Sequence, residues 1–276
     1  MKKKIILGSA KFGLKYGLSG KKTKVTDEEI EKIFKYFLNK KIFSFDTSYD
    51  YGLSERNIFQ KFKNKSKVYS KFTKKNFDQI FKHFKLYNIK PYCLTFHKFE
   101  DYLDKKFRTK VINKAKKNNI HKIGVSIYSS DQYSKIENDV KIIQLPISII
   151  DQYFIDNNFI QKIKKRKIEI HARSVFFRGL LASDLKTIKK KYPYISSHIN
   201  LLSEFARKSK LKMHELSLVW INSLKDIDKI ILGVDSLAQL KRNLELLNTK
   251  KPKNLNILFK NLKKLKKVNF DLSKWK

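Results

Sequence analysis

Short apolar runs recur along the chain, and each is followed by a polar or glycine-containing turn and then by a segment of helical periodicity. The runs are nearly continuous and do not alternate apolar with polar residues. Such runs are typical of parallel strands that are buried on both faces of a sheet. The eight runs, and so the eight expected strands, lie at residues 4–9, 42–46, 68–71, 92–97, 122–126, 141–145, 168–172 and 229–233.

The segments between these runs predict helices. In residues 26–38, Thr26 and Glu29 stand at the spacing of a capping box, and the apolar residues that follow repeat every three or four positions. The other expected helices, with weaker periodicity, are residues 54–64, 75–87, 109–119, 130–137, 156–166, 212–224 and 236–248.

The alternation of strand and helix, repeated eight times without a break in composition, predicts a single (β/α)₈ TIM barrel domain over residues 1–276. A doubly wound open sheet is the alternative, but no glycine-rich dinucleotide fingerprint follows the first strand. Two parts depart from the repeat, a long loop region after the seventh strand (residues 173–211) and a basic amphipathic C-terminal helix (residues 255–266). We expect this helix to pack across the barrel, although helices of this type also lie on membrane surfaces.

The formal net charge of +38 is the most unusual feature of the composition. A strongly basic protein is a candidate for binding nucleic acid or an acidic membrane. Only seven of the 63 basic residues are arginine, however, and Asn, Ile and Phe are abundant as well. These residues share A/T-rich codons with lysine, so we attribute the lysine excess mainly to genomic base composition. We expect no specific nucleic-acid partner, because no recognisable module of arginines and aromatics is present.

Metal chemistry and a secreted location are both disfavoured. The single cysteine, Cys93, excludes an internal disulfide and a multi-cysteine metal site, and the six histidines form no H-E-x-x-H motif. The start, MKKKIILGSAKFG, is similar to a signal peptide, but Lys11 interrupts its short apolar core. No apolar run approaches membrane-spanning length. We therefore expect a soluble, cytoplasmic protein with no metal and no membrane partner.

Four polar residues are expected at neighbouring strand ends. Asp46, Lys71 and His97 each close an apolar run, and Tyr51 lies in the loop just after Asp46. Each residue alone has an ordinary structural interpretation, such as a helix-capping aspartate or a buried histidine. A barrel, however, would bring all four to one mouth at the carboxyl ends of its strands.

This set of side chains suits the protonation of a carbonyl oxygen. A tyrosine hydroxyl has an ordinary pKa of about 10, and a nearby ammonium such as Lys71 favours the phenolate. Asp46 would hold that ammonium in place, and His97 would orient the carbonyl oxygen or share the proton. The carbon of the same carbonyl would receive a hydride, which no side chain supplies, so a cofactor is expected.

The stretches that carry these residues resemble the aldo-keto reductase superfamily almost from end to end. FDTSYDYGLSE (45–55) is similar to the DTA-x-x-YG-x-SE motif of the family, and SK (70–71) and TFHKFEDY (95–102) are similar to its lysine and histidine strands. LGSAKFGLKYG precedes them, and KIGVSIYS, QLPISIIDQ, HARSVFFRGLLA and GVDSLAQLKRN follow in the order of the family.

The resemblance implies an NAD(P)H-dependent oxidoreductase that reduces an aldehyde or a ketone to an alcohol. It implies that Tyr51 is the general acid and base, that Lys71 and Asp46 tune it, and that His97 positions the substrate carbonyl. The rival interpretations are a regulatory barrel that binds cofactor without catalysis and a basic nucleic-acid-binding protein.

The cofactor residues implied by the resemblance include three departures from the family pattern. Ile127 stands where many members have asparagine, and Arg173 stands where an aromatic residue stacks on the nicotinamide. Asp235 adds a negative charge where a 2′-phosphate needs cations, which leaves Lys241 or Arg242 as the candidate cations for that phosphate. NADPH is the expected cofactor, with NADH the alternative. The implied cofactor residues are Ser126, Gln144, Arg173, Ser174, Gly233, Ser236, Gln239 and Asn243.

The substrate side is less specific. Arg178 is a candidate to pair with a carboxylate or phosphate of the substrate, or else to form a structural ion pair. Phe176 and Phe177 are candidates for the pocket wall, although packing is the favoured interpretation for both. The HARSVFFRGLLA stretch resembles a subgroup linked to bacterial surface-sugar biosynthesis, which implies a sugar derivative as the carbonyl substrate.

Overall fold

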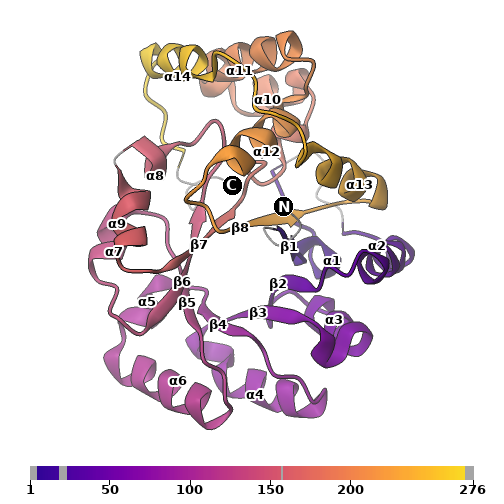
Figure 1. Ribbon diagram of the computed structural model, residues 1–276, viewed down its shortest axis with the longest axis vertical. Coiled ribbons are helices and arrows are strands. Elements are labelled where there is room, and N and C mark those ends of the chain that lie inside the picture. Colours follow the sequence, from indigo (N-terminus) through magenta and orange to yellow (C-terminus); the bar gives the residue numbers. More distant parts are fainter. Residues whose placement is uncertain (1–4, 19–23, 157, 271–276) are drawn as a thin grey trace.

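The computed structural model describes residues 5–18, 24–156 and 158–270. All eight expected strands form, and they close into a parallel barrel in which β8 pairs with β1 (Figure 1). The (β/α)₈ barrel predicted from the sequence is therefore confirmed. The strands are β1 (Ile5–Gly8), β2 (Ser44–Ser48), β3 (Lys67–Phe72), β4 (Cys93–Phe96), β5 (Ile123–Ser126), β6 (Val140–Pro146), β7 (Glu169–Arg173) and β8 (Lys229–Gly233).

Both faces of the strands are buried, as the continuous apolar runs indicated. Ile6, Tyr69 and Ile231 belong to a cluster that fills the inside of the barrel. Leu7 and Phe45 belong to the larger core between the strands and the surrounding helices. The barrel is thus a packed core, and a ligand can be reached only from its ends.

Helices surround the barrel, and every helix expected from the sequence is present. Thr26 caps α2 as predicted, because its hydroxyl accepts a hydrogen bond from the backbone N–H of Glu29 at 3.3 Å. The expected helix over residues 130–137 is shorter than predicted and ends at Ser134. The helices on the barrel are α1 (Ala10–Gly13), α2 (Asp27–Asn39), α3 (Ser54–Phe62), α4 (Phe77–Leu86), α5 (Phe99–Leu103), α6 (Lys105–Lys117), α7 (Ser130–Ser134), α8 (Tyr153–Asp156), α9 (Phe159–Lys165), α12 (Met213–Ser223) and α13 (Leu237–Leu246), with 3₁₀ turns at Lys63–Lys65 and Lys74–Asn76.

The long region after β7 is mostly helical. It contains α10 (Leu185–Lys191) and α11 (Ser196–Lys208), with 3₁₀ turns at Leu180–Ala182 and Pro193–Ile195. The expected C-terminal helix is α14 (Leu255–Lys264). It packs beside α11 at the outer edge of the molecule and not across the end of the barrel (Figure 1).

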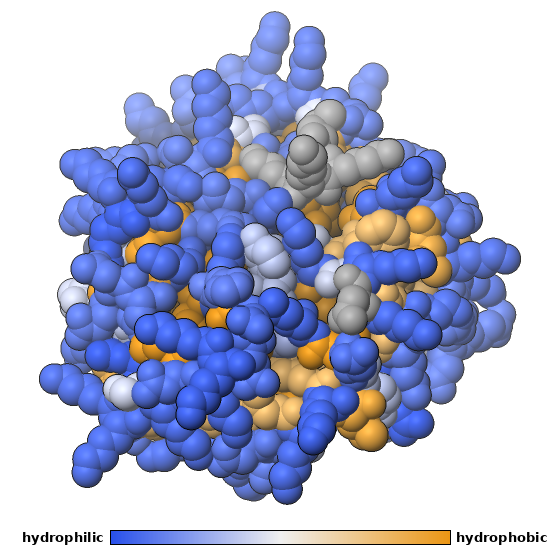
Figure 2. Space-filling view, turned by 60° about the horizontal axis from the view of Figure 1, so that its bottom comes forward, coloured by the Kyte–Doolittle hydropathy of each residue, from blue (hydrophilic) through white to orange (hydrophobic). Residues whose placement is uncertain are grey.

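Hydrophilic side chains dominate the surface. Figure 2 shows them projecting over most of one face, with apolar side chains visible between them. No helix within the described ranges is long and apolar enough to cross a membrane.

Candidate active site

The four predicted catalytic residues lie together at the carboxyl ends of β2, β3 and β4. Asp46 Oδ2 and Lys71 Nζ form a buried ion pair. The Lys71 ammonium lies 5.2 Å from the centroid of the Tyr51 ring. The rings of Tyr51 and His97 meet edge to face, with centroids 6.0 Å apart. One cluster therefore contains a phenol, an ammonium, a carboxylate and an imidazole.

Gln144 joins this cluster from β6. Its Nε2 donates a hydrogen bond to Asp46 Oδ1 at 2.7 Å, although 98 residues separate the two in sequence. A buried carboxylate is costly unless it is paired and hydrogen-bonded. Lys71 and Gln144 satisfy one oxygen of Asp46 each, so the carboxylate is held in place.

Backbone contacts fix the loop that carries Tyr51. The Tyr51 N–H donates to the Ser48 carbonyl at 3.0 Å, and the Ser54 N–H donates to the Tyr51 carbonyl at 3.2 Å. Gly13 of α1 packs directly on this loop, since a Cβ at Gly13 would lie 1.6 Å from the Tyr51 carbonyl oxygen. Gly52 adopts a φ of +57°, which glycine tolerates readily. The two glycines thus allow the turn that places Tyr51 over Lys71.

The surroundings of Tyr51 keep its hydroxyl protonated. Burial raises the pKa of Tyr51 well above its ordinary value, and the Asp46 carboxylate raises it further, while Arg173 opposes the shift. Burial and the Asp46 carboxylate thus dominate the pKa of Tyr51 in this state, and the charge of Lys71 is paired with Asp46. At neutral pH Tyr51 is a proton donor.

His97 is neutral at physiological pH. Burial, and after it the Lys71 ammonium, lower its pKa to about 4. A neutral imidazole donates one hydrogen bond and accepts another. His97 can therefore orient a carbonyl oxygen without adding a permanent charge.

Ser126 and Gln144, which are expected to hold the nicotinamide amide, are partners at the ends of β5 and β6. Gln144 Oε1 is buried and has no hydrogen-bond partner among the described residues. Because Nε2 of the same side chain is bound to Asp46, this oxygen is an acceptor that still needs a donor. The N–H of a carboxamide fits that need. Ile127 is fully buried and supplies no substitute for the asparagine of the family.

Arg173 occupies the place of the expected stacking aromatic. Its Nε donates to Ser126 Oγ at 3.2 Å, and a terminal nitrogen donates to the Ile127 carbonyl at 3.3 Å. The guanidinium lies 4.2 Å from the centroid of the Tyr128 ring. All these partners are uncharged, so Arg173 adds a positive charge at the strand ends. The sequence analysis did not identify Tyr128 as a residue of the site. The only signal for it was its position just after the KIGVSI strand, where the chain reaches the mouth of the barrel.

The residues expected at the adenosine end lie at the end of β8 and along α13. Ser236 caps α13 by accepting from the Gln239 N–H at 3.2 Å, and Gln239 Oε1 accepts from the Asp235 N–H at 2.9 Å. Asn243 is buried, whereas Gly233 is exposed. This group lies on separate elements from the Tyr51 cluster, as an extended ligand would require.

Three cations lie next to this group, and two of them are engaged in ion pairs with carboxylates. Lys241 is exposed on α13. Arg242 donates to Glu215 at 2.7 Å, which ties up its guanidinium. Lys11 forms an ion pair with Asp235 at 2.7 Å. The sequence analysis did not predict this role for Lys11, whose only signal was its place in the loop after the first strand. Lys11 therefore offsets the negative charge of Asp235.

The remaining predicted residues are divided between the mouth and the core. Ser174 follows β7 with a φ of +56°. Arg178 reaches the mouth, where it hydrogen-bonds Tyr128. Phe176 packs edge-on against His214, with ring centroids 5.8 Å apart, and joins the core. The packing interpretation thus fits Phe176, while Arg178 lies near the cluster.

Fold and site together define a barrel enzyme, because a partly ionised polar cluster lies at the carboxyl ends of the strands, where (β/α)₈ enzymes carry their active sites. Residues 4–258 match the model of the aldo/keto reductase family. The chain therefore belongs to the aldo/keto reductase family, and this membership makes it an oxidoreductase of carbonyl compounds.

Solved structures agree with this assignment at the level of the fold. The thermostable aldo-keto reductase Tm1743, solved with the inhibitor epalrestat, is 16% identical, with 94% of each chain covered and a TM-score of 0.65. PA4992 from Pseudomonas aeruginosa, a protein assigned to the aldo-keto reductases, is 14% identical, with 88% of each chain covered and a TM-score of 0.63. The comparison with proteins of curated function gave no match.

Proposed function

We propose that the protein is an NAD(P)H-dependent reductase that converts an aldehyde or a ketone into an alcohol, with Tyr51 donating the proton. The observation that carries this proposal is the buried Asp46–Lys71 pair beneath the Tyr51 ring, with His97 at the edge of that ring. A regulatory barrel that only binds cofactor would have no need of this arrangement.

The protein groups divide the work on the substrate. The Tyr51 hydroxyl and His97 would hydrogen-bond the carbonyl oxygen and so fix the orientation of the carbonyl. As the carbonyl carbon gains a hydride, negative charge develops on the oxygen, and the Tyr51 proton moves to it. Lys71 would stabilise the phenolate that remains on Tyr51. Asp46, held by Gln144, keeps the ammonium under the ring.

A nicotinamide cofactor, when bound, supplies the hydride. Ser126 and the open acceptor of Gln144 would hold its carboxamide, with Arg173 beside them. Ser174 would contact phosphate, and the β8–α13 group of Gly233, Ser236, Gln239 and Asn243 would hold the adenosine end. We propose NADPH as the preferred form, with Lys11 and Lys241 as the cations nearest the expected 2′-phosphate, and NADH as the alternative.

The substrate and the extent of the functional unit complete the proposal. A sugar derivative is the proposed substrate, based on the resemblance of the HARSVFFRGLLA stretch, with Arg178 available for an acidic group. Residues 1–276 would act as a single catalytic domain.

Titration of the purified protein with NADPH and with NADH, followed through quenching of intrinsic fluorescence, tests the cofactor. The same samples are then assayed with a panel of aldehydes for cofactor oxidation. Binding with turnover supports the reductase, whereas tight binding without turnover of any carbonyl would favour the regulatory barrel. Binding of neither cofactor by the folded protein would overturn both.

A further inference from the structure

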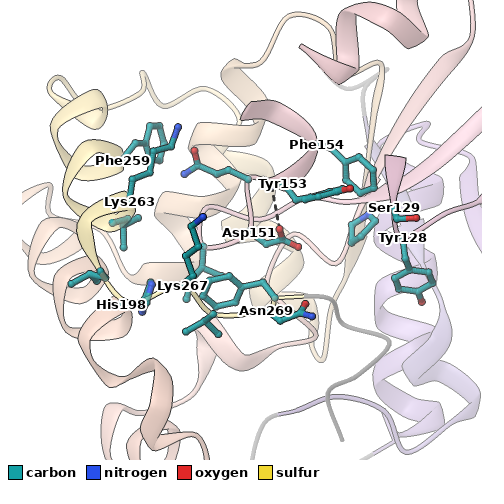
Figure 3. Close-up of a pocket in the computed structure, with 17 residues that line it drawn as sticks. Tyr128, Ser129, Asp151, Tyr153, Phe154, His198, Phe259, Lys263, Lys267 and Asn269 are labelled. Carbon is teal, nitrogen blue, oxygen red and sulfur yellow. Dashed lines mark hydrogen bonds between the residues drawn. The ribbon is translucent and has the colours of Figure 1, made fainter. Parts of the chain in front are cut away.

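A cavity of about 700 Å³ lies next to the active-site mouth (Figure 3). Its walls come from the loop after β6, from α11 and α14, and from residues 265–270. We propose that this cavity binds the part of the substrate remote from the carbonyl, and that this part carries a carboxylate or phosphate on an apolar body. The inference deepens the proposed function and rests on it.

Two residues that line the cavity also neighbour Arg173 at the mouth. Tyr128, which lines the cavity, is the ring that stacks on Arg173. Pro146, which also lines it, is the β-sheet partner of Arg173. Figure 3 shows Tyr128 and Ser129 at one end of the cavity, with Phe259 and Lys263 at the other. A ligand whose carbonyl lies near Tyr51 would, on this proposal, extend past Tyr128 into the cavity.

Size and apolar walls suit an organic ligand. Small-molecule sites usually measure about 300–1,000 Å³ and are lined mainly by apolar and aromatic side chains. Ile150, Phe154, Phe259, Leu262 and Val268 supply such walls here. Burial of an apolar body against them would provide affinity.

The charges around the cavity select an anion. Lys263 and Lys267 line it, and Asp151 is the one carboxylate among its lining residues. Asp151 is buried, and its Oδ1 accepts from the Tyr153 N–H at 3.3 Å. Arg173 adds a further positive charge behind Tyr128. Positive side chains thus outnumber the one carboxylate around the cavity, and an excess of one sign of charge attracts the opposite sign.

The proposed cofactor site leaves this cavity free. The residues assigned to the adenosine end lie on α13, whereas the cavity lies beside α8 and α14. Figure 1 shows α13 and α8 on opposite sides of the barrel. A cofactor that runs from Gln144 towards α13 therefore does not enter the cavity.

The test compares an anionic aldehyde with its neutral ester. Binding of 4-formylphenoxyacetate and of its methyl ester is measured by calorimetry, with NADP⁺ present so that no reduction occurs. For the wild type we expect the acid to bind about tenfold more tightly than the ester. The double variant Lys263→Gln/Lys267→Gln should lower this ratio to about twofold or less. The double variant Lys264→Gln/Lys266→Gln removes the same charge at neighbouring positions that do not line the cavity, and it should retain the ratio.

Each outcome decides one point, provided that melting temperatures show both double variants folded. The cavity proposal would be overturned if the wild type bound the acid and the ester equally, or if the two double variants had the same ratio of acid to ester affinity. This holds even if both aldehydes are reduced in a separate assay. A ratio that depends on Lys263 and Lys267 would support it even if neither aldehyde is reduced, whereas the reductase proposal fails only if no carbonyl of the panel is turned over. A third ligand, 4-formylphenyl phosphate, identifies phosphate if it binds more tightly than the acid, and carboxylate if it binds more weakly.

Discussion

Tyr51 is the residue on which the proposed chemistry depends, and its raised pKa makes it a donor and not a resident phenolate. Tyr51→Phe removes the transferable proton while keeping the ring that packs on His97. We expect kcat for carbonyl reduction to fall by about 10²- to 10⁴-fold. The cofactor Kd should stay within about twofold, because the proposed mechanism places the hydroxyl against the substrate carbonyl. Steady-state kinetics and a fluorescence titration measure the two quantities.

Tyr49→Phe is the matched control for this prediction. Tyr49 lies two positions earlier, with its ring against His83 at 5.6 Å between centroids. Its loss of a hydroxyl should leave kcat near the wild-type value. Undiminished reduction by Tyr51→Phe would show that another group supplies the proton.

Arg173 should make the protein discriminate between the two redox states of the cofactor. The oxidised nicotinamide ring is a cation and the reduced ring is neutral, and Arg173 is bonded to Ser126, which we assign to the carboxamide. The Arg173 guanidinium and the oxidised nicotinamide ring, as neighbours in a partly solvated site, would repel each other by about 1–3 kcal/mol. We therefore expect the reduced cofactor to bind at least about tenfold more tightly than the oxidised one.

Two variants isolate the charge of Arg173. Arg173→Gln should bring the Kd values of the two redox forms to within about threefold, whereas Arg173→Lys should keep most of the difference. Equal affinity of the wild type for both forms, measured by fluorescence titration, would show that the guanidinium moves away when the cofactor binds.

At the scale of single residues, the sequence predicted the residue types, the strand ends and the Asp46–Lys71 pair, but not the other side-chain contacts of the site. Asp46, Lys71 and His97 could be predicted because each closes an apolar run, and strand ends share one face of a barrel. The bond from Gln144 to Asp46 could not, because contacts across the barrel interior depend on register and tilt. The stacking of Arg173 on Tyr128 likewise depends on side-chain rotamers that no periodicity encodes.

The contact between α1 and the Tyr51 loop is an element-scale requirement of the site. Gly13→Ala would place a methyl group against the Tyr51 carbonyl, and backbone cannot move as cheaply as a side chain. We expect a loss of about 1–3 kcal/mol in the free energy of unfolding, with a fall of at least about tenfold in carbonyl reduction. Urea unfolding and steady-state assays measure these effects.

Gly233→Ala is the control for the stability part of this prediction. No atom lies within 4 Å of a Cβ built at Gly233, so its free energy of unfolding should match that of the wild type. An equally stable, fully active Gly13→Ala variant would contradict the proposed role of this contact.

Glu169 links β7 to the start of β5 at the opposite end of the barrel from the site. Its carboxylate binds His171 at 2.9 Å and Lys122 at 3.1 Å. Burial raises the pKa of Glu169, but the hydrogen bonds and charges of His171 and Lys122 outweigh burial and bring it to about 2. The folded pKa is thus below the unfolded value of about 4.3, so this interaction stabilises the fold above that pH and is lost as the pH falls towards 2.

Glu169→Gln should therefore lower the free energy of unfolding at pH 7 by about 1–3 kcal/mol, and the difference from the wild type should narrow at pH 3. Urea titrations at both pH values measure it. Glu204→Gln, which removes an exposed carboxylate on α11, should behave like the wild type. A constant difference between Glu169→Gln and the wild type across this range would rule out the ionic origin.

At the scale of elements, the order of strands and helices could be predicted from the sequence. The packing of the helices at the outer edge of the molecule could not. Residues 42–46 or 229–233 could be recognised as strands because both faces are apolar, and the barrel followed from repetition. The α14 helix was recognised from its amphipathic pattern, but that pattern fits any apolar neighbour. Its place beside α11 depends on the helices of the region after β7, whose packing the sequence left open.

The whole molecule carries 63 basic and only 25 acidic side chains, so its surface charges repel one another. Figure 2 shows hydrophilic side chains projecting over most of one face, with apolar areas between them. Surface ion pairs add little stability to offset such a charge. Repulsion of this kind destabilises the compact state, because the unfolded chain keeps its charges further apart.

Salt should therefore stabilise this protein. The Debye length falls from about 14 Å to about 4 Å between roughly 0.05 M and 0.5 M NaCl, which screens the long-range repulsion more than the buried Asp46–Lys71 pair. We expect the Tm to rise by several degrees over this range, and the free energy of unfolding to rise with it. A Tm that falls with salt would mean that surface ion pairs outweigh repulsion.

The same increase in salt should abolish binding to two unrelated DNA duplexes, which should bind with equal affinity at low salt because such binding would come from net charge alone. A duplex preference that survives at high salt would instead restore nucleic acid as a partner.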